Sequence, residues 1–130
     1  MIAAVAGAAG SGLVADAQAC QLPAGVRLET ERLALSYRTI PSKIVVGEHF
    51  VLELAVCPKQ NVELSGKIKL DAHMPEHRHG MNYRPNVVPV TPPGQPGRYR
   101  SDGWLFHMSG RWEFVFELGG ERLADSVRIE

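Results

Sequence analysis

The stretch RWEFVFELGGERLADSVRIE, residues 111–130, decides the fold. Every second residue of its first half is large and apolar: Trp112, Phe114, Phe116 and Leu118. This period of two predicts a strand with one buried face. Gly119-Gly120 is a hairpin-turn signal. The returning segment offers Leu123, Val127 and Ile129 as inward residues, with Ala124-Asp125 interrupting strict alternation. The stretch therefore predicts a terminal β-hairpin.

The same period recurs upstream, in residues 31–38, 49–57, 67–74 and 103–108. Residues 44–48 are a further short extended piece, with Gly47 as a turn. No segment shows a sustained helical stripe. About seven short strands with frequent turns are typical of an all-β, immunoglobulin-like antiparallel β-sandwich. The proline-rich stretch 75–97 is expected to be a long ordered loop, and such loops are often functional.

The overall composition narrows the possible functions. The chain has 130 residues, which suits one domain, and its 14 basic residues balance its 14 acidic ones. No basic stripe argues for nucleic acid or anionic lipid. No nucleophile elbow or phosphate-cradling glycine loop occurs, so we expect no enzymatic activity.

Residues 1–19 differ from the rest, because they are small and apolar with small-x-small patterns at Ala15-Asp16-Ala17 and Ala17-Gln18-Ala19. We interpret them as a cleaved signal peptide, which leaves residues 20–130 as the mature domain, exported to the periplasm with no membrane span. The alternative is an Ala/Gly tail with no targeting role.

The two cysteines, Cys20 and Cys57, fit export, since an even count in an exported chain predicts one disulfide. That disulfide would pin the new N-terminus to a strand end. The alternative is lipidation of Cys20, although Gln18 and Ala19 make a poor lipidation signal.

Candidate metal ligands crowd into DAHMPEHRHGMNY, residues 71–83. Imidazole and thioether together suit copper, and Met favours the reduced ion. On an extended segment one side would carry four of these residues: His73, His77, His79 and Met81. His107, on a later predicted strand, can approach them if the two strand ends are neighbours. Asp71 could orient His73 as a hydrogen-bond acceptor, or could be a solvated strand residue.

Strand parity separates the two His-Met pairs of the chain. Met74 falls on the predicted core face of its strand, and Met108 on that of Trp104 and Phe106, so both are second choices as ligands and are expected to fill the core. A loop in which the histidines merely hydrogen-bond the backbone remains the alternative to a metal site.

The segments DAHMPEHRHGMNYRP and GRYRSDGWLFHMSGRWEFVFEL resemble the YtkA-like (FixH-related) domains of exported bacterial proteins over about residues 43–129. The matching positions are Met74, Pro75, His79, Gly80, Gly97, Tyr99, Phe106, Met108, Gly110 and Trp112. The resemblance implies an immunoglobulin-like β-sandwich at the cell envelope, with links to copper or cytochrome-oxidase biology. Periplasmic copper chaperones also carry His-Met ligands on a β-sandwich, but His107-Met108 departs from their His-x-Met spacing.

The sequence therefore predicts two alternative functions. The first is copper binding or delivery through His73, His77, His79, Met81 and His107. The second is a protein-interaction module without metal, in which loop 75–97 and the aromatic hairpin dock an envelope partner such as a cytochrome or an oxidase assembly factor.

Overall fold

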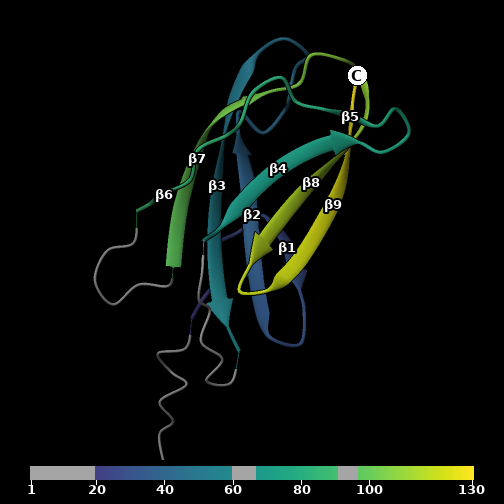
Figure 1. Cartoon of the computed structure of the whole chain (residues 1–130). Helices are drawn as coiled ribbons and strands as arrows, with labels where there is room; N and C mark the ends of the chain where they lie inside the picture. Colours follow the sequence, from purple (N-terminus) through teal and green to yellow (C-terminus); the bar gives the residue numbers. More distant parts are fainter. Residues whose placement is uncertain (1–19, 60–66, 91–96) are drawn as a thin grey trace, which may run out of the picture.

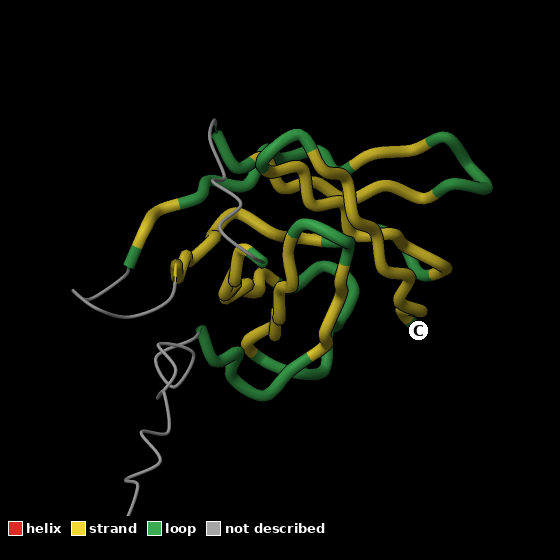
Figure 2. Tube along the Cα trace, turned by 90° about the horizontal axis from the view of Figure 1, so that it is seen from below, coloured by secondary structure: helices red, strands yellow, loops and turns green. Residues whose placement is uncertain are grey.

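The computed structural model describes residues 20–59, 67–90 and 97–130, and over these ranges the chain is all-β (Figures 1 and 2). The strands are β1 (Val26–Glu29), β2 (Leu33–Ile40), β3 (His49–Pro58), β4 (Lys69–Met74), β5 (His79–Gly80), β6 (Val88–Pro89), β7 (Gly97–Leu105), β8 (Gly110–Leu118) and β9 (Glu121–Ile129). The expected signal peptide, residues 1–19, lies outside the described residues. Within the described ranges, no helix is long and apolar enough to cross a membrane.

The strands form two antiparallel sheets that pack as a sandwich (Figure 1). One sheet has the order β1-β2-β3-β7-β6 and the other the order β5-β4-β8-β9. The predicted antiparallel β-sandwich is thus confirmed, with seven strands of four or more residues and two strands of two residues among the described ranges.

Three local predictions need correction. Residues 44–48 form no strand, and β1 was not predicted. The stretch 75–97, predicted to be a loop, contributes the short strands β5 and β6. The expected turn at Gly47 is confirmed, since its positive φ of 81° suits a turn and its amide donates to the Phe106 carbonyl at 2.8 Å.

The core lies between the sheets, where alternate residues of facing strands interlock. Phe106 and Trp112 stack with their ring centroids 4.3 Å apart, and Trp104 lies edge-on to Phe114 at 5.4 Å. Apolar burial of this kind is the main source of stability in such a fold. The fully buried aromatic side chains are Trp104, Phe106, Trp112, Phe114 and Phe116.

Asp125 does not break the alternation of β9, contrary to the sequence interpretation. The residue lies opposite Phe114, on the inner face of the sheet, and its carboxylate accepts a hydrogen bond from the Tyr37 hydroxyl. A carboxylate is tolerated at an inner position when a donor satisfies it. The bond joins β2 of one sheet to β9 of the other.

Cys20 and Cys57 form the predicted disulfide. Cys57 lies near the end of β3, so the bond ties the start of the described chain to the five-stranded sheet. A bonded Cys20 is not available for lipidation.

Candidate functional site

The hairpin of β4 and β5 decides where the predicted ligands point. Met74 lies opposite His79 and His73 lies opposite Gly80, across a four-residue turn, 75–78, in which Arg78 has a positive φ of 49°. Residues directly opposite in an antiparallel pair share one face of the sheet. His79 therefore lies on the inner side with Met74, and His73 lies on the outer side. The expectation that an extended segment would present both histidines on one side is wrong.

His79 meets His107 at the rim of the sandwich. Their ring centroids are 5.1 Å apart, and the rings are steeply inclined, with an interplanar angle of 73°. The two residues come from β5 and from the connection between β7 and β8. The structure therefore joins one member of the predicted loop cluster to the distant candidate from the second His-Met pair.

The environment of His107 is apolar on one side. Its ring packs edge-on against Trp112, at a centroid distance of 5.6 Å. The Nδ1 atom of His107 is buried and makes no hydrogen bond within the part of the chain that the structure describes. Because a buried polar atom without a partner is costly, such an atom points to an unmet ligand or proton partner.

Trp112 also fixes the backbone that carries His107. Its indole Nε1 donates to the Met108 carbonyl at 2.9 Å, while its ring stacks on Phe106. Trp112 therefore contacts the residues on both sides of His107: it stacks on the Phe106 ring and it bonds the Met108 carbonyl. A ligand on a fixed backbone loses less conformational freedom when it binds.

The three methionines near these histidines occupy different environments. Met74 is fully buried, as predicted, and its methyl group occupies the space that a Cβ on Gly110 would enter, at 2.6 Å. Met81 is partly buried and packs against the core. Met108, predicted to be a core residue, is instead 37% exposed. The reason is that β7 ends at Leu105, so its alternation does not extend to residue 108.

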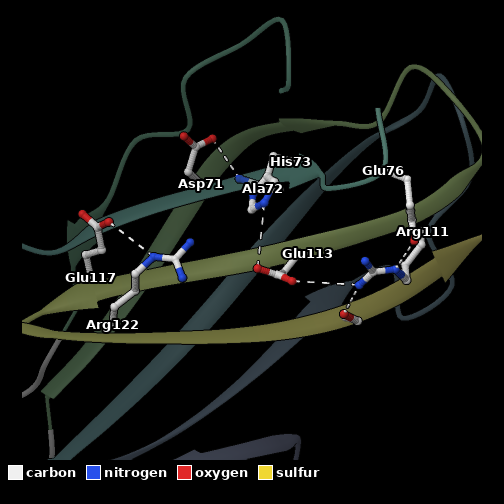
Figure 3. Close-up of polar contacts among 9 residues, drawn as sticks. Asp71, Ala72, His73, Glu76, Arg111, Glu113, Glu117 and Arg122 are labelled. Atoms are coloured by element: carbon white, nitrogen blue, oxygen red, sulfur yellow. Dashed lines mark hydrogen bonds and ion pairs between the residues drawn. The ribbon is translucent and has the colours of Figure 1, made fainter. Parts of the chain in front are cut away.

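His73 belongs to a polar network on the outer face of the four-stranded sheet (Figure 3). Its Nε2 lies 3.9 Å from Glu113 Oε1, and Glu113 Oε2 lies 3.9 Å from Arg111 Nη1. Arg111 Nε in turn donates to Glu76 at 2.7 Å. That hydrogen bond, with the positive charge of Arg111, holds the pKa of the Glu76 carboxyl below its usual value.

Asp71 does not orient His73 in the way that the sequence suggested as one possibility. Its Oδ1 accepts the Ala72 amide at 2.8 Å, as Figure 3 shows, and the carboxylate near His73 is that of Glu113. Sequence reasoning missed Glu113. Cross-strand register could have found it, since His73 and Glu113 are partners in β4 and β8.

His77 lies in the exposed turn between β4 and β5, where its backbone amide donates to the Met74 carbonyl at 3.2 Å. Within the described ranges, no three His, Cys, Asp or Glu side chains are grouped closely enough to hold a metal ion. A metal bound to the His79–His107 pair therefore needs a ligand of another type, such as a thioether.

No protein-family model matches the chain, and neither curated proteins nor solved structures show a match.

Proposed function

We propose that this protein is an exported, YtkA-like β-sandwich that binds copper through His79 and His107. The observation that carries the proposal is the contact of these two rings beside the buried, unpartnered Nδ1 of His107. Imidazole is a common copper ligand, and it binds in the neutral form through a free ring nitrogen.

The distance between the rings supports a shared ion. With a metal–nitrogen bond of about 2.0 Å, two imidazoles at a tetrahedral angle have ring centroids about 5 Å apart. The observed separation of His79 and His107 is 5.1 Å. The bent arrangement leaves room for further ligands, because two ligands alone do not fill a tetrahedral ion's coordination sphere.

Thioethers are the candidates for those further ligands. Met108 directly follows His107 and is partly exposed, and Met81 lies two residues beyond His79. Soft thioether sulfur favours Cu(I) over harder divalent ions. Met74 contributes packing beneath the site, since it is fully buried. His73 and His77 are left out of this ligand set, because one faces Glu113 and the other lies in the exposed turn.

The proposed location outside the cytoplasm has separate support. The Cys20–Cys57 disulfide is the kind of bond that persists in oxidising compartments and is rare in reducing ones. Copper would be delivered by ligand exchange with a recipient protein, and no covalent step is required.

A competition experiment tests the site. Cu(I) is titrated into the protein against a chromophoric chelator under anaerobic conditions. We expect His79→Ala plus His107→Ala to weaken the affinity strongly, whereas His73→Ala plus His77→Ala leaves it nearly unchanged, because neither of these two residues belongs to the proposed ligand set. Equal losses in both double variants would contradict the assignment.

A second candidate function, docking of an envelope partner, is favoured by one observation. Tyr83, Val88 and Val90 are each about half exposed in the segment that follows the β4–β5 hairpin. The aromatic side chains of β8 do not contribute, because Trp112, Phe114 and Phe116 are buried.

A pull-down from envelope extracts separates this function from copper binding. Docking predicts a partner that is lost on Tyr83→Ser plus Val88→Ser and retained on His79→Ala plus His107→Ala. Retention of the partner in the first double variant would exclude this surface.

A further inference from the structure

The last strand, β9, forms a long edge of the four-stranded sheet (Figure 1). Among the strands that the structure describes, it pairs with β8 alone. The other edge strands, β1, β5 and β6, have four, two and two residues, against nine in β9. Proteins usually protect a long edge with a proline or a bulge. Residues 121–129 contain no proline, and their register with β8 is continuous, so this edge is a template for a further strand.

The turn before β9 shows which of its backbone groups face outward. Gly119 and Gly120 have positive φ values of 57° and 79°, which fit a two-residue hairpin turn, so Leu118 and Glu121 form a hydrogen-bonded pair. Hydrogen-bonded and non-hydrogen-bonded pairs alternate along an antiparallel ladder. Every second residue of β9 therefore directs its N–H and C=O groups away from β8. These residues are all exposed, and they are Arg122, Ala124, Ser126 and Arg128.

A second copy of β9 fits this edge in a restricted set of registers. Residues directly opposite each other share a face of the sheet, so inward residues must face inward residues. One allowed antiparallel register places Ser126 opposite itself, on a two-fold axis. Asp125 then faces Val127 and needs no new partner, because its carboxylate accepts from Tyr37. The other pairs combine opposite charges, two buried apolar side chains, or a small and a long side chain: Arg122 with Glu130, Leu123 with Ile129, and Ala124 with Arg128.

The registers nearer the turn are less favourable. Moving the axis by one residue, to Asp125, places this carboxylate opposite itself and Arg122 opposite Arg128. Like charges directly opposite each other destabilise a strand pair. Moving the axis one residue further places Asp125 opposite the buried Leu123. Charge and burial therefore both select the register centred on Ser126.

Arg122 is able to form the new ion pair. Its Nε lies 3.9 Å from Glu117 Oε1 in the same sheet, and both side chains are about half exposed. An exposed pair at this distance is weak and does not occupy all the donors of a guanidinium group. The remaining donors of Arg122 are available for Glu130 of a second copy.

We propose that two copies of this protein pair through β9 in the register centred on Ser126, so that their four-stranded sheets become one continuous sheet. The dimer leaves the His79–His107 pair accessible, because β5, which carries His79, forms the opposite edge of the sheet. The proposal does not rest on copper binding.

Sedimentation equilibrium over a range of protein concentrations tests the dimer. Arg122→Glu and Glu130→Arg each place like charges opposite, and each should weaken dimerisation by about tenfold. The double variant restores opposite charges with their signs exchanged, and should recover most of the affinity. Arg100→Glu is the control, since it reverses an exposed arginine that pairs with Asp102 on the other sheet, and should leave the dimer unchanged.

Two further measurements locate the interface. The amides of Ala124, Ser126 and Arg128 should be protected from hydrogen exchange at high protein concentration and lose this protection on dilution. Ala124→Pro removes an outward N–H without removing a bond to β8, so it should abolish the dimer and leave a folded monomer.

The proposal is overturned if the protein remains a monomer up to its solubility limit, or if a dimer forms without concentration-dependent protection in β9. A dimer that neither charge reversal weakens, or that Arg122→Glu strengthens, also overturns it, because the strands would then pair differently. Should Ala124→Pro lose its thermal unfolding transition, recovery of the dimer in the double charge variant decides, and its absence excludes the register.

Discussion

His73 and His79 lie six residues apart in one hairpin, yet they meet opposite surroundings. His73 lies on the outer face beside Glu113, within a network of charged side chains. His79 lies on the inner side of the rim, against His107, whose ring rests on Trp112. The first histidine has charged neighbours that solvent can screen. The second histidine is itself exposed, but its ring lies against that of His107, whose buried Nδ1 has no partner among the described residues.

Residue type alone therefore does not define a metal site. Two histidines become candidate ligands when the fold brings their rings together and a ring nitrogen has no other partner. The outer histidine lies 3.9 Å from the Glu113 carboxylate instead. Four predictions test this difference between the inner and outer faces of β4, β8 and β9.

The largest difference in unfolding free energy is expected between substitutions of Trp112 and Glu113, which are neighbours in β8 but point to opposite faces of the sheet. Trp112→Ala removes a fully buried ring that stacks on Phe106 and supports His107, and should lower the free energy of unfolding by about 3–5 kcal/mol. Glu113→Ala, on the outer face, should lower it by less than about 1 kcal/mol. Chemical denaturation measures both variants, and similar losses would remove the distinction between the faces.

Met74 and His73, which are adjacent in β4, allow the same comparison of inner and outer faces, with a smaller expected difference in unfolding free energy. Met74→Ala empties the space beneath Gly110 and should cost about 2–4 kcal/mol of unfolding free energy. His73→Ala should change it by about 0.5 kcal/mol or less, because the side chain is partly exposed. Thermal unfolding monitored by circular dichroism provides the measurement. A costly His73→Ala would show that the outer network stabilises the fold.

The Tyr37–Asp125 bond between the sheets predicts a pH dependence. Burial, followed by the hydrogen bond to Asp125, raises the pKa of the Tyr37 phenol above its ordinary value. In the unfolded chain the phenol has its ordinary pKa of about 10, so it loses its proton at a lower pH than in the folded protein. The free energy of unfolding should therefore be constant below about pH 10 and fall as the pH rises further. Tyr37→Phe should cost about 1–3 kcal/mol at neutral pH and remove much of the alkaline decline.

Urea denaturation between pH 8 and pH 11 tests this expectation. Tyr83→Phe serves as the matched control, since Tyr83 is half exposed. An alkaline decline that is the same in Tyr37→Phe as in the unmodified protein would assign the effect to other groups.

The smallest effect is expected in the polar network on the outer face, where Arg111 contacts Glu76. Arg111→Met removes the cation that donates to Glu76, so the pKa of the Glu76 carboxyl should rise toward its ordinary value. An NMR titration of the glutamate side chains follows this change. Arg122→Met, which removes the ion-pair partner of Glu117 instead, is the control and should leave Glu76 unchanged. An unaltered Glu76 titration in Arg111→Met would mean that the contact does not persist in solution.

Much of the fold was predictable because strand alternation is a local property. The inward positions of Trp112, Phe114 and Phe116 followed from their spacing, and Met74 was correctly placed in the core. Met108 was misplaced, since the sequence does not mark that β7 ends at Leu105. Asp125 was taken as an interruption because its partner, Tyr37, lies 88 residues away in the other sheet.

The candidate site was predictable only as a set of residue types. The sequence supplied the histidines and methionines, and it raised the idea that His107 could approach the first group. Which histidine His107 meets depended on the turn 75–78. With Met74 opposite His79, the even-numbered residues of β4 share a face with the odd-numbered residues of β5. Counting along one extended segment could not reveal this exchange of parity.

By itself, the sequence determined the antiparallel β architecture and the cysteines available to form the disulfide. These follow from the period-two burial of apolar side chains and from the number of cysteines present. Only the tertiary structure decided that His79 faces His107 and that His73 faces Glu113. The physical reason is that burial patterns are local, whereas turn register and contacts between sheets depend on how distant segments pack together.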